Sequence, residues 1–204
     1  MPRPPSHEGP YTAAMPTPPP LVRAGALSEA EILEVALAII EEHGIDGLTM
    51  RQLSSRLGVA LGATYHHVKN KDALLVLVAR SLFDRVEIPA IDDPRDWTLQ
   101  VREVLLSLTD VFTGQSELAG WILAHFEETA PSEIMIRMRG MLANAGFGPE
   151  ATEEALNPLF FYVAGMLVGG FTSFGDEQTT RQLRQNFERG LDIILTGIRV
   201  DLQP

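Results

Sequence analysis

The sequence TMRQLSSRLGVALGATYHHVKNKDALL, residues 49–75, decides the fold of this 204-residue chain. Leu53 and Leu57 are four residues apart, and the residues between them are polar, which predicts a short helix with one buried stripe. Thr49 is a suitable N-cap for this helix, and Gly58 has the conformational freedom that a tight turn between two helices requires. A short helix, a glycine turn and a second short helix are the layout of a helix-turn-helix DNA-binding motif.

Helices are also predicted on both sides of this motif. Upstream, Ser28 followed by Glu31 has the pattern of a capping box, and apolar residues repeat at helical spacing as far as His43. The second helix of the motif is expected over about residues 60–67, and Asn70 is expected to cap the helix that follows. The motif therefore lies within a small helical domain.

The charges of the chain are distributed unevenly. The whole chain has a net charge of −11, which taken alone argues against binding to phosphates. Residues 48–85 contain six Lys or Arg residues and two Asp residues, a net charge of +4 that leaves −15 for the remainder. A cationic region on an acidic body would turn that region toward DNA and repel DNA from the other faces.

The motif resembles the DNA-binding segment of the TetR family of bacterial transcriptional regulators. The resemblance lies in Thr49, Gly58-Val59, Gly62-Ala63-Thr64-Tyr65 and Lys69-Asn70-Lys71-Asp72, and residues 67–71 are especially similar to the tetracycline-repressor branch. With the upstream helix included, it covers about a quarter of the chain. It implies that the second helix of the motif is a recognition helix and that a larger helical domain follows.

The expected DNA interface combines the start of the first motif helix with the second one. Arg51 lies on a first turn whose exposed amides suit a phosphate, and Leu61 would face a thymine methyl group. Ala60 and Ala63 replace hydroxyl residues that often hold phosphates in the family, so these two anchors to the DNA backbone are missing. Because Leu61 offers no hydrogen bond to a base edge, we also expect little direct readout of bases. The expected contact residues are Thr49, Arg51, Ala60, Leu61, Gly62, Thr64, Tyr65, His66, His67 and Lys71.

The rest of the chain also shows helical periodicity, and no segment alternates as a strand does, so the fold class is all-α. Residues 156–174 contain no charged residue, but their glycine and polar content and acidic flanks argue against a membrane span. We expect a disordered proline-rich arm over residues 1–24, a helix-turn-helix domain over 25–75 and a helical domain over 76–204. The arm lacks the apolar core of a secretory signal, and it is either a passive tail or a segment that reaches the minor groove through Arg23.

The resemblance gives residues 76–204 two further roles. In the family the last two helices pair with those of a second subunit, and Gly165, Gly169 and Gly170 would let such helices approach closely. The domain is also where a small-molecule effector binds, and the expected lining residues are Phe112, Trp121, His125, Phe126, Met138, Phe161 and Tyr162. Ordinary core is the other interpretation of each, because apolar residues at helical spacing usually just pack. His125 also precedes a proline, as a metal-holding His does in tetracycline repressors, and the alternative is a buried His bonded to backbone.

No catalytic or cofactor signature is found. The sequence lacks a Gly-x-Ser-x-Gly elbow, a His-Glu-x-x-His helix, a P-loop and a complete dinucleotide fingerprint. His66 and His67 are adjacent and point roughly 100° apart on a helix, so they cannot share a metal without other ligands. We therefore expect no enzyme activity, no cofactor and no metal. The absence of cysteine suits a reducing cytoplasm.

The expected function is that of a ligand-responsive transcriptional regulator, and we expect it to act as a repressor. It would bind a palindromic operator in double-stranded DNA as a homodimer, without a membrane, and an apolar or aromatic effector would release it. The alternative is a helical protein that binds small molecules or acts as a scaffold and has lost DNA binding. Ala60 and Ala63, which lack the hydroxyl groups common in the family, and the acidic total charge favour that alternative.

Overall fold

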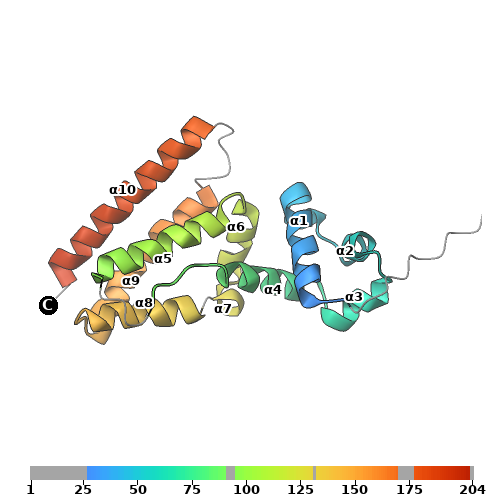
Figure 1. Ribbon diagram of the computed structural model, residues 1–204, viewed down its shortest axis with the longest axis horizontal. Helices are drawn as coiled ribbons and strands as arrows, with labels where there is room; N and C mark the ends of the chain where they lie inside the picture. Colours follow the sequence, from blue (N-terminus) through green and yellow to red (C-terminus); the bar gives the residue numbers. More distant parts are fainter. Residues whose placement is uncertain (1–26, 91–94, 131, 170–176, 203–204) are drawn as a thin grey trace, which may run out of the picture.

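The computed structural model describes residues 27–90, 95–130, 132–169 and 177–202. These residues form ten α-helices and no strand, which confirms the all-α prediction. Figure 1 shows α1, α2 and α3 together at one end of the elongated molecule and α9 and α10 toward the other. The helices are α1 (Glu29–Gly47), α2 (Met50–Leu57), α3 (Leu61–His67), α4 (Lys71–Phe83), α5 (Trp97–Phe112), α6 (Ser116–Ala124), α7 (Phe126–Thr129), α8 (Ser132–Asn144), α9 (Pro149–Gly169) and α10 (Glu177–Leu202). The expected N-terminal arm lies outside the described residues.

The predicted helix caps are confirmed. The Ser28 hydroxyl accepts from the backbone N–H of Glu31, whose carboxylate in turn accepts from the N–H of Ser28. Thr49 Oγ1 accepts from the N–H of Gln52 at 3.1 Å, and Asn70 Oδ1 caps α4 at 2.8 Å. Local side-chain chemistry therefore sets where the N-terminal helices begin.

Two glycines of this domain have a positive φ, one at the end of α2 and one inside α1. Gly58 has φ 67° and ψ 31°, so it ends α2 and turns the chain into α3. Gly44 has φ 70° and ψ 176°, which interrupts α1 one residue beyond the predicted end at His43. A side chain at either position would be strained, because only glycine adopts these conformations readily.

The core is continuous across the predicted domain boundary. A cluster of buried side chains from α1, α2 and α4 includes Phe112 of α5 and Leu118 and Ile122 of α6. The expected division between residues 75 and 76 falls inside α4, so this helix belongs to both parts of the molecule. The N-terminal three helices are therefore joined to the rest by a packed helix and not by a linker.

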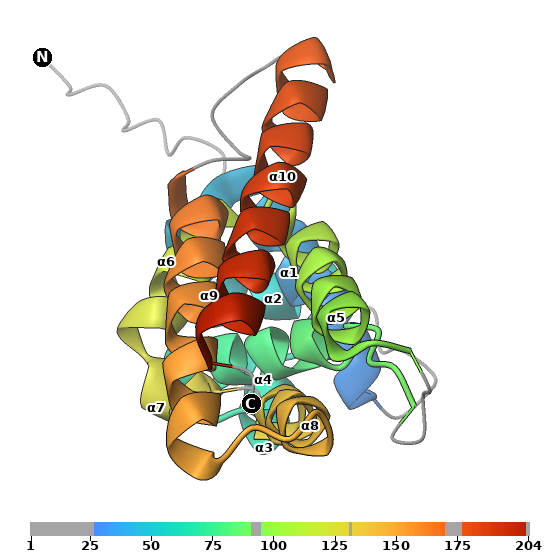
Figure 2. The same ribbon diagram turned by 90° about the vertical axis from the view of Figure 1, so that its left-hand side faces the viewer.

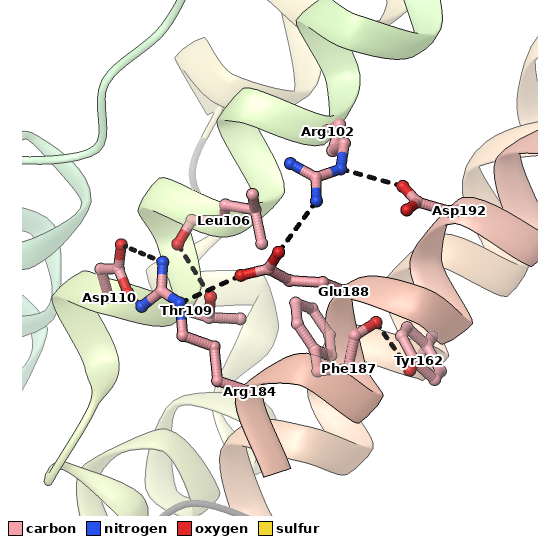
Figure 3. Close-up of polar contacts among 9 residues, drawn as sticks. All are labelled: Arg102, Leu106, Thr109, Asp110, Tyr162, Arg184, Phe187, Glu188 and Asp192. Carbon is pink, nitrogen blue, oxygen red and sulfur yellow. Dashed lines mark hydrogen bonds and ion pairs between the residues drawn. The ribbon is translucent and has the colours of Figure 1, made fainter. Parts of the chain in front are cut away.

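The C-terminal helix α10 lies beside α9 (Figure 2) and is tied to α5 by arginine carboxylate pairs (Figure 3). Arg102 binds Glu188 at 3.0 Å and Asp192 at 2.9 Å. Arg184 binds Glu188 at 3.1 Å and also pairs with Asp110. Since these pairs are partly exposed, they fix the orientation of α10 more than they stabilise the fold.

Tyr162, expected to line a ligand pocket, instead joins α9 to α10. Its ring stacks on Phe187 with centroids 5.1 Å apart, and its hydroxyl donates to the Phe187 carbonyl at 3.0 Å. Burial raises the pKa of the Tyr162 hydroxyl, which stays protonated and able to donate. A Cβ at Gly190 would collide with the Tyr162 ring, so the contact depends on a glycine there.

None of the described helices combines the length and the apolar character that crossing a membrane requires.

Candidate nucleic-acid interface and internal cavity

Helix α3 packs against α2 through one face only. Leu53 and Leu57 of α2 are buried, and Thr64 of α3 is completely buried with its hydroxyl donating to the Leu61 carbonyl at 2.7 Å. The expectation that Thr64 contacts DNA is therefore corrected. Its side chain faces the domain core and its hydroxyl is already bonded to its own helix, so it positions α3.

The opposite face of α3 is exposed. Leu61 is 39% exposed and Tyr65 is 47% exposed, and being four residues apart they lie on the same side of the helix. Gly62, His66 and His67 are exposed as well. Leu61 and Tyr65 therefore form a small apolar patch on an exposed helix, and the major groove of DNA admits a helix of this size.

Three cations accompany this face. Arg51, Lys69 and Lys71 have no ion-pair partner among the described residues, so their charges are available to phosphates. Arg56 is different, because Glu42 of α1 binds its guanidinium with both carboxylate oxygens. Its hydrogen bonds lower the pKa of Glu42 and raise that of Arg56, so Arg56 is occupied within the protein.

The cationic character is also more local than the sequence count indicated. Residues 27–85, with α1 included, carry six Lys or Arg and eight Asp or Glu, a net charge of −2. The positive charge therefore belongs to the surface of α2, α3 and the start of α4, while α1 is acidic. Thr49 and Ala60 flank that surface, and Thr49 is exposed with its hydroxyl oxygen engaged in capping α2.

The N-terminus of α3 is uncapped, since Ala60 offers no side-chain acceptor. We expect Ala60→Ser to raise the free energy of unfolding by about 0.5–1 kcal/mol through a new N-cap. Its hydroxyl would also add a phosphate donor, so DNA affinity should rise, and both can be measured by thermal unfolding and fluorescence anisotropy. Ala60→Val, which adds bulk without a hydroxyl, is the control, and an equal gain from Val would contradict this explanation.

A partly open cavity of about 90 Å³ lies among the helices of the C-terminal part. Among the described residues, no charged or hydrogen-bonding side chain lines its walls. They are made of Phe83, Leu105, Leu108, Phe112, Ala119, Ile122, Leu123, Phe126, Ile134, Met135, Met138, Leu156, Leu159, Phe160, Val163, Ala164 and Leu167. A site of this kind takes apolar molecules and offers nothing to compensate a buried charge or polar group.

Three of the seven expected lining residues, Phe112, Phe126 and Met138, do line the cavity. Phe161 does not, because it is 70% exposed on the outer side of α9. Sequence periodicity identified the helix but could not assign its faces. The lining residues that were missed follow the same apolar spacing as ordinary core, and no local signal separates them from it.

Trp121 and His125 lie next to each other outside the cavity wall. Their rings stack with centroids 4.2 Å apart, and His125 Nδ1 lies 2.9 Å from the Trp121 carbonyl oxygen. Because a carbonyl can only accept, Nδ1 must carry a proton and donate. This matches the backbone hydrogen bond of the alternative for His125, while the side chain is partly and not fully buried. Within the described ranges no group of three or more potential ligands is arranged to hold a metal.

Helix α6 joins the cavity to the N-terminal domain. Its residues Ala119, Ile122 and Leu123 line the cavity. At its other end, Glu117 Oε2 accepts from the backbone N–H of Ile45 at 2.9 Å, and Gln115 donates to Glu41 at 2.8 Å. Sequence reasoning missed this link because its partners are more than 70 residues apart.

Comparison with known proteins yields one consistent result. The family model of bacterial regulatory proteins, tetR family, matches residues 32–78. The tetracycline repressor protein class G of Vibrio anguillarum is 31% identical over 157 residues, which cover 74% of this chain and 73% of the repressor. BioQ, solved with its natural double-stranded DNA operator, superposes with a TM-score of 0.66 at 28% identity over 85% of this chain and 99% of BioQ. A TetR variant from Acinetobacter baumannii, solved with minocycline, gives a TM-score of 0.69 at 27% identity over 85% and 97% of the two chains.

Proposed function

Because the chain belongs to the tetR family of bacterial regulatory proteins, we propose that it is a repressor whose homodimer binds a palindromic operator. Membership makes the protein a ligand-responsive DNA-binding regulator and not an enzyme. The observation that carries the proposal is the exposed Leu61 and Tyr65 face of α3, flanked by unpaired cations, in the same chain as an apolar cavity. Because the operator would lie on DNA in the cytoplasm, we propose that the protein is cytoplasmic.

In the proposed complex α3 lies in the major groove. Leu61 would contact a thymine methyl group, and Tyr65 would reach a base edge or the backbone beside it. Arg51 and Lys71 would bind phosphates and fix the register of α3 without reading sequence. BioQ, which shares this fold, is solved with a duplex operator, and this supports a duplex as the partner here.

A second copy of the chain would cover α9 and α10. Phe161, Val168, Ile193 and Val200 are exposed large apolar residues on these two helices. A Cβ at Gly165 or Gly169 would meet open space, so a partner helix can approach closely there. Two recognition helices about one DNA turn apart, roughly 34 Å, would then match the two halves of a palindrome.

The dimer is tested at Ile193, which is 65% exposed. We expect Ile193→Arg to shift the protein to monomers in sedimentation and to weaken operator binding at least tenfold, because each monomer holds one half-site. Ile136 of α8 is 61% exposed outside these helices, so Ile136→Arg is the matched control and should stay dimeric. Dimers that persist with Ile193→Arg would place the interface elsewhere.

We propose that an effector releases DNA by binding in the apolar cavity. Its volume of about 90 Å³ is well below the ~300–1,000 Å³ of sites for drug-sized ligands. A larger occupant would extend out of the cavity or separate the helices around it, and α6 would carry such a movement to α1 through Glu117. The two DNA-binding heads would then leave the spacing that the operator requires.

The chemistry of the effector follows from the same walls. None of the described side chains that line the cavity can hydrogen-bond a ligand. Burial of unpaired polar groups is costly, so the part of the effector inside this cavity is apolar.

Two observations favour a second function, that of a small-molecule-binding protein that no longer reads DNA. Ala60 leaves α3 without a cap, and residues 27–85 carry a net charge of −2. The experiment that separates the two functions is selection of the purified chain against fragments of its own genome. Enrichment of a palindrome supports the repressor. A folded dimer that enriches no sequence would support the alternative.

A further inference from the structure

The apolar cavity adjoins a second, polar hollow of about 420 Å³. The two share Phe83 of α4 and Ile134 of α8 as lining residues, so these side chains form the partition between them. Phe83 also contacts Phe112 in the cavity wall, with ring centroids 5.1 Å apart. A molecule that displaces Phe83 or Ile134 can therefore occupy both spaces at once.

The charged side chains in the hollow differ in whether they have a hydrogen-bond or ion-pair partner. The Arg80 guanidinium donates to the Glu128 carbonyl at 3.2 Å, so it is turned toward α7. Asp84 and Glu133 are exposed carboxylates without an ion-pair partner among the described residues. Asp84 lies four residues after Arg80 and yet does not pair with it. Among the described residues that line the hollow, two unpaired carboxylates therefore face one engaged cation.

We propose that the effector is a cationic amphiphile, with its apolar part in the cavity and its cationic head in the hollow beside Asp84 and Glu133. This inference rests on the proposed function, because the cavity is the effector site. It follows from size and polarity together, since the cavity alone is small and accepts no charge, while the adjoining hollow supplies volume and opposite charge. The Phe83 ring at the partition adds a face on which a quaternary ammonium group can rest.

The position of the head also connects it to DNA binding. Arg80, Phe83 and Asp84 lie in the last turn of α4 or directly after it, and Lys71 begins the same helix. A head group held at this end and an apolar group that displaces Phe83 both act on α4. Occupation of the two spaces is thereby coupled to the element that adjoins the recognition helix.

Three probes of similar size test the proposal by calorimetry on the full chain at low salt. They are benzyltrimethylammonium, its neutral isostere neopentylbenzene, and the anion 3-phenylpropanoate. We expect the cation to bind most tightly. Asp84→Asn and Glu133→Gln should each weaken it by about two- to fivefold, as for exposed charge pairs, and leave the neutral isostere unchanged. Glu150→Gln, at an exposed carboxylate outside the hollow, should change neither.

The apolar half is tested with Ala164→Phe, which places a ring at the cavity wall and should abolish binding of all three probes. If this variant does not fold, Leu159→Met, a conservative change in the same wall, should still alter the affinity of the cation and the neutral isostere alike. Preference for the anion, equal binding of the cation and its isostere, or carboxylate variants without effect would overturn the inference. Operator affinity is measured in parallel. If the wild-type protein binds the operator and any of these results is found, the cationic amphiphile is rejected and the proposed repressor function stands. If the wild-type protein does not bind the operator, the proposed function itself is rejected.

Discussion

Removal of the Tyr65 side chain is expected to weaken operator binding by about 1–3 kcal/mol, roughly 5- to 150-fold. Tyr65 is 47% exposed on the outer face of α3 and packs little within the domain, so Tyr65→Ala should leave thermal stability almost unchanged. Lys71→Ala should weaken binding to all sequences about equally and reduce the salt dependence by about one counterion, because Lys71 is proposed to contact a phosphate. Fluorescence anisotropy at several salt concentrations measures both.

Arg139→Ala is the control for the loss of a cation. Arg139 lies on α8 and pairs with Glu153, an exposed pair of little energetic weight. This variant should bind the operator as the wild type does. If Tyr65→Ala and Lys71→Ala both retained wild-type affinity, the DNA-binding surface would have to lie elsewhere.

The second large effect is expected at Gly44, where α1 meets α6. A Cβ at Gly44 would lie 2.5 Å from Glu117 Oε2, and φ is +70°. Gly44→Ala should therefore lower the free energy of unfolding by about 2–4 kcal/mol, from backbone strain and from displacement of the Glu117 carboxylate. In a Glu117→Ala background the collision is absent, and the cost should fall to about 1–3 kcal/mol, the strain alone.

This double-mutant cycle is measured by chemical denaturation. Gly140 of α8 has an ordinary helical backbone and open space at its Cβ position, so Gly140→Ala is the control and should be neutral or slightly stabilising. Equal costs of Gly44→Ala in both backgrounds would mean that Glu117 does not hold α6 against α1. The proposed route from the cavity to the DNA-binding helices would then lose its main contact.

Local signals explain which features could be predicted from the sequence. Thr49 and Asn70 cap helices and Gly58 makes a turn through contacts with residues nearby in the chain. These roles could therefore be predicted from the sequence, and they are confirmed. The face that a helix buries is set by distant partners, so the resemblance placed Thr64 on the outer face and periodicity placed Phe161 on the inner one, and both are wrong. The α1 to α6 link and the partition formed by Phe83 and Ile134 join segments far apart in sequence, and no local pattern marks them.

The pairing of Arg56 with Glu42 shows a related limit. A count of charges along residues 48–85 treats every cation as available, whereas the structure places Glu42 of the preceding helix against one of them. Composition predicted that the surface of α2, α3 and the start of α4, which we propose faces DNA, carries a positive charge. The size of the free charge depends on packing, and it is carried by Arg51, Lys69 and Lys71.

The most direct test of the central claim is an affinity titration of the full chain with its selected DNA fragment at two salt concentrations. The proposed repressor predicts saturable binding of two chains to one duplex, with an affinity that falls steeply as salt rises, because phosphate contacts release counterions. A folded protein that binds the selected fragment no better than random DNA, or that binds no DNA at either salt concentration, would contradict it.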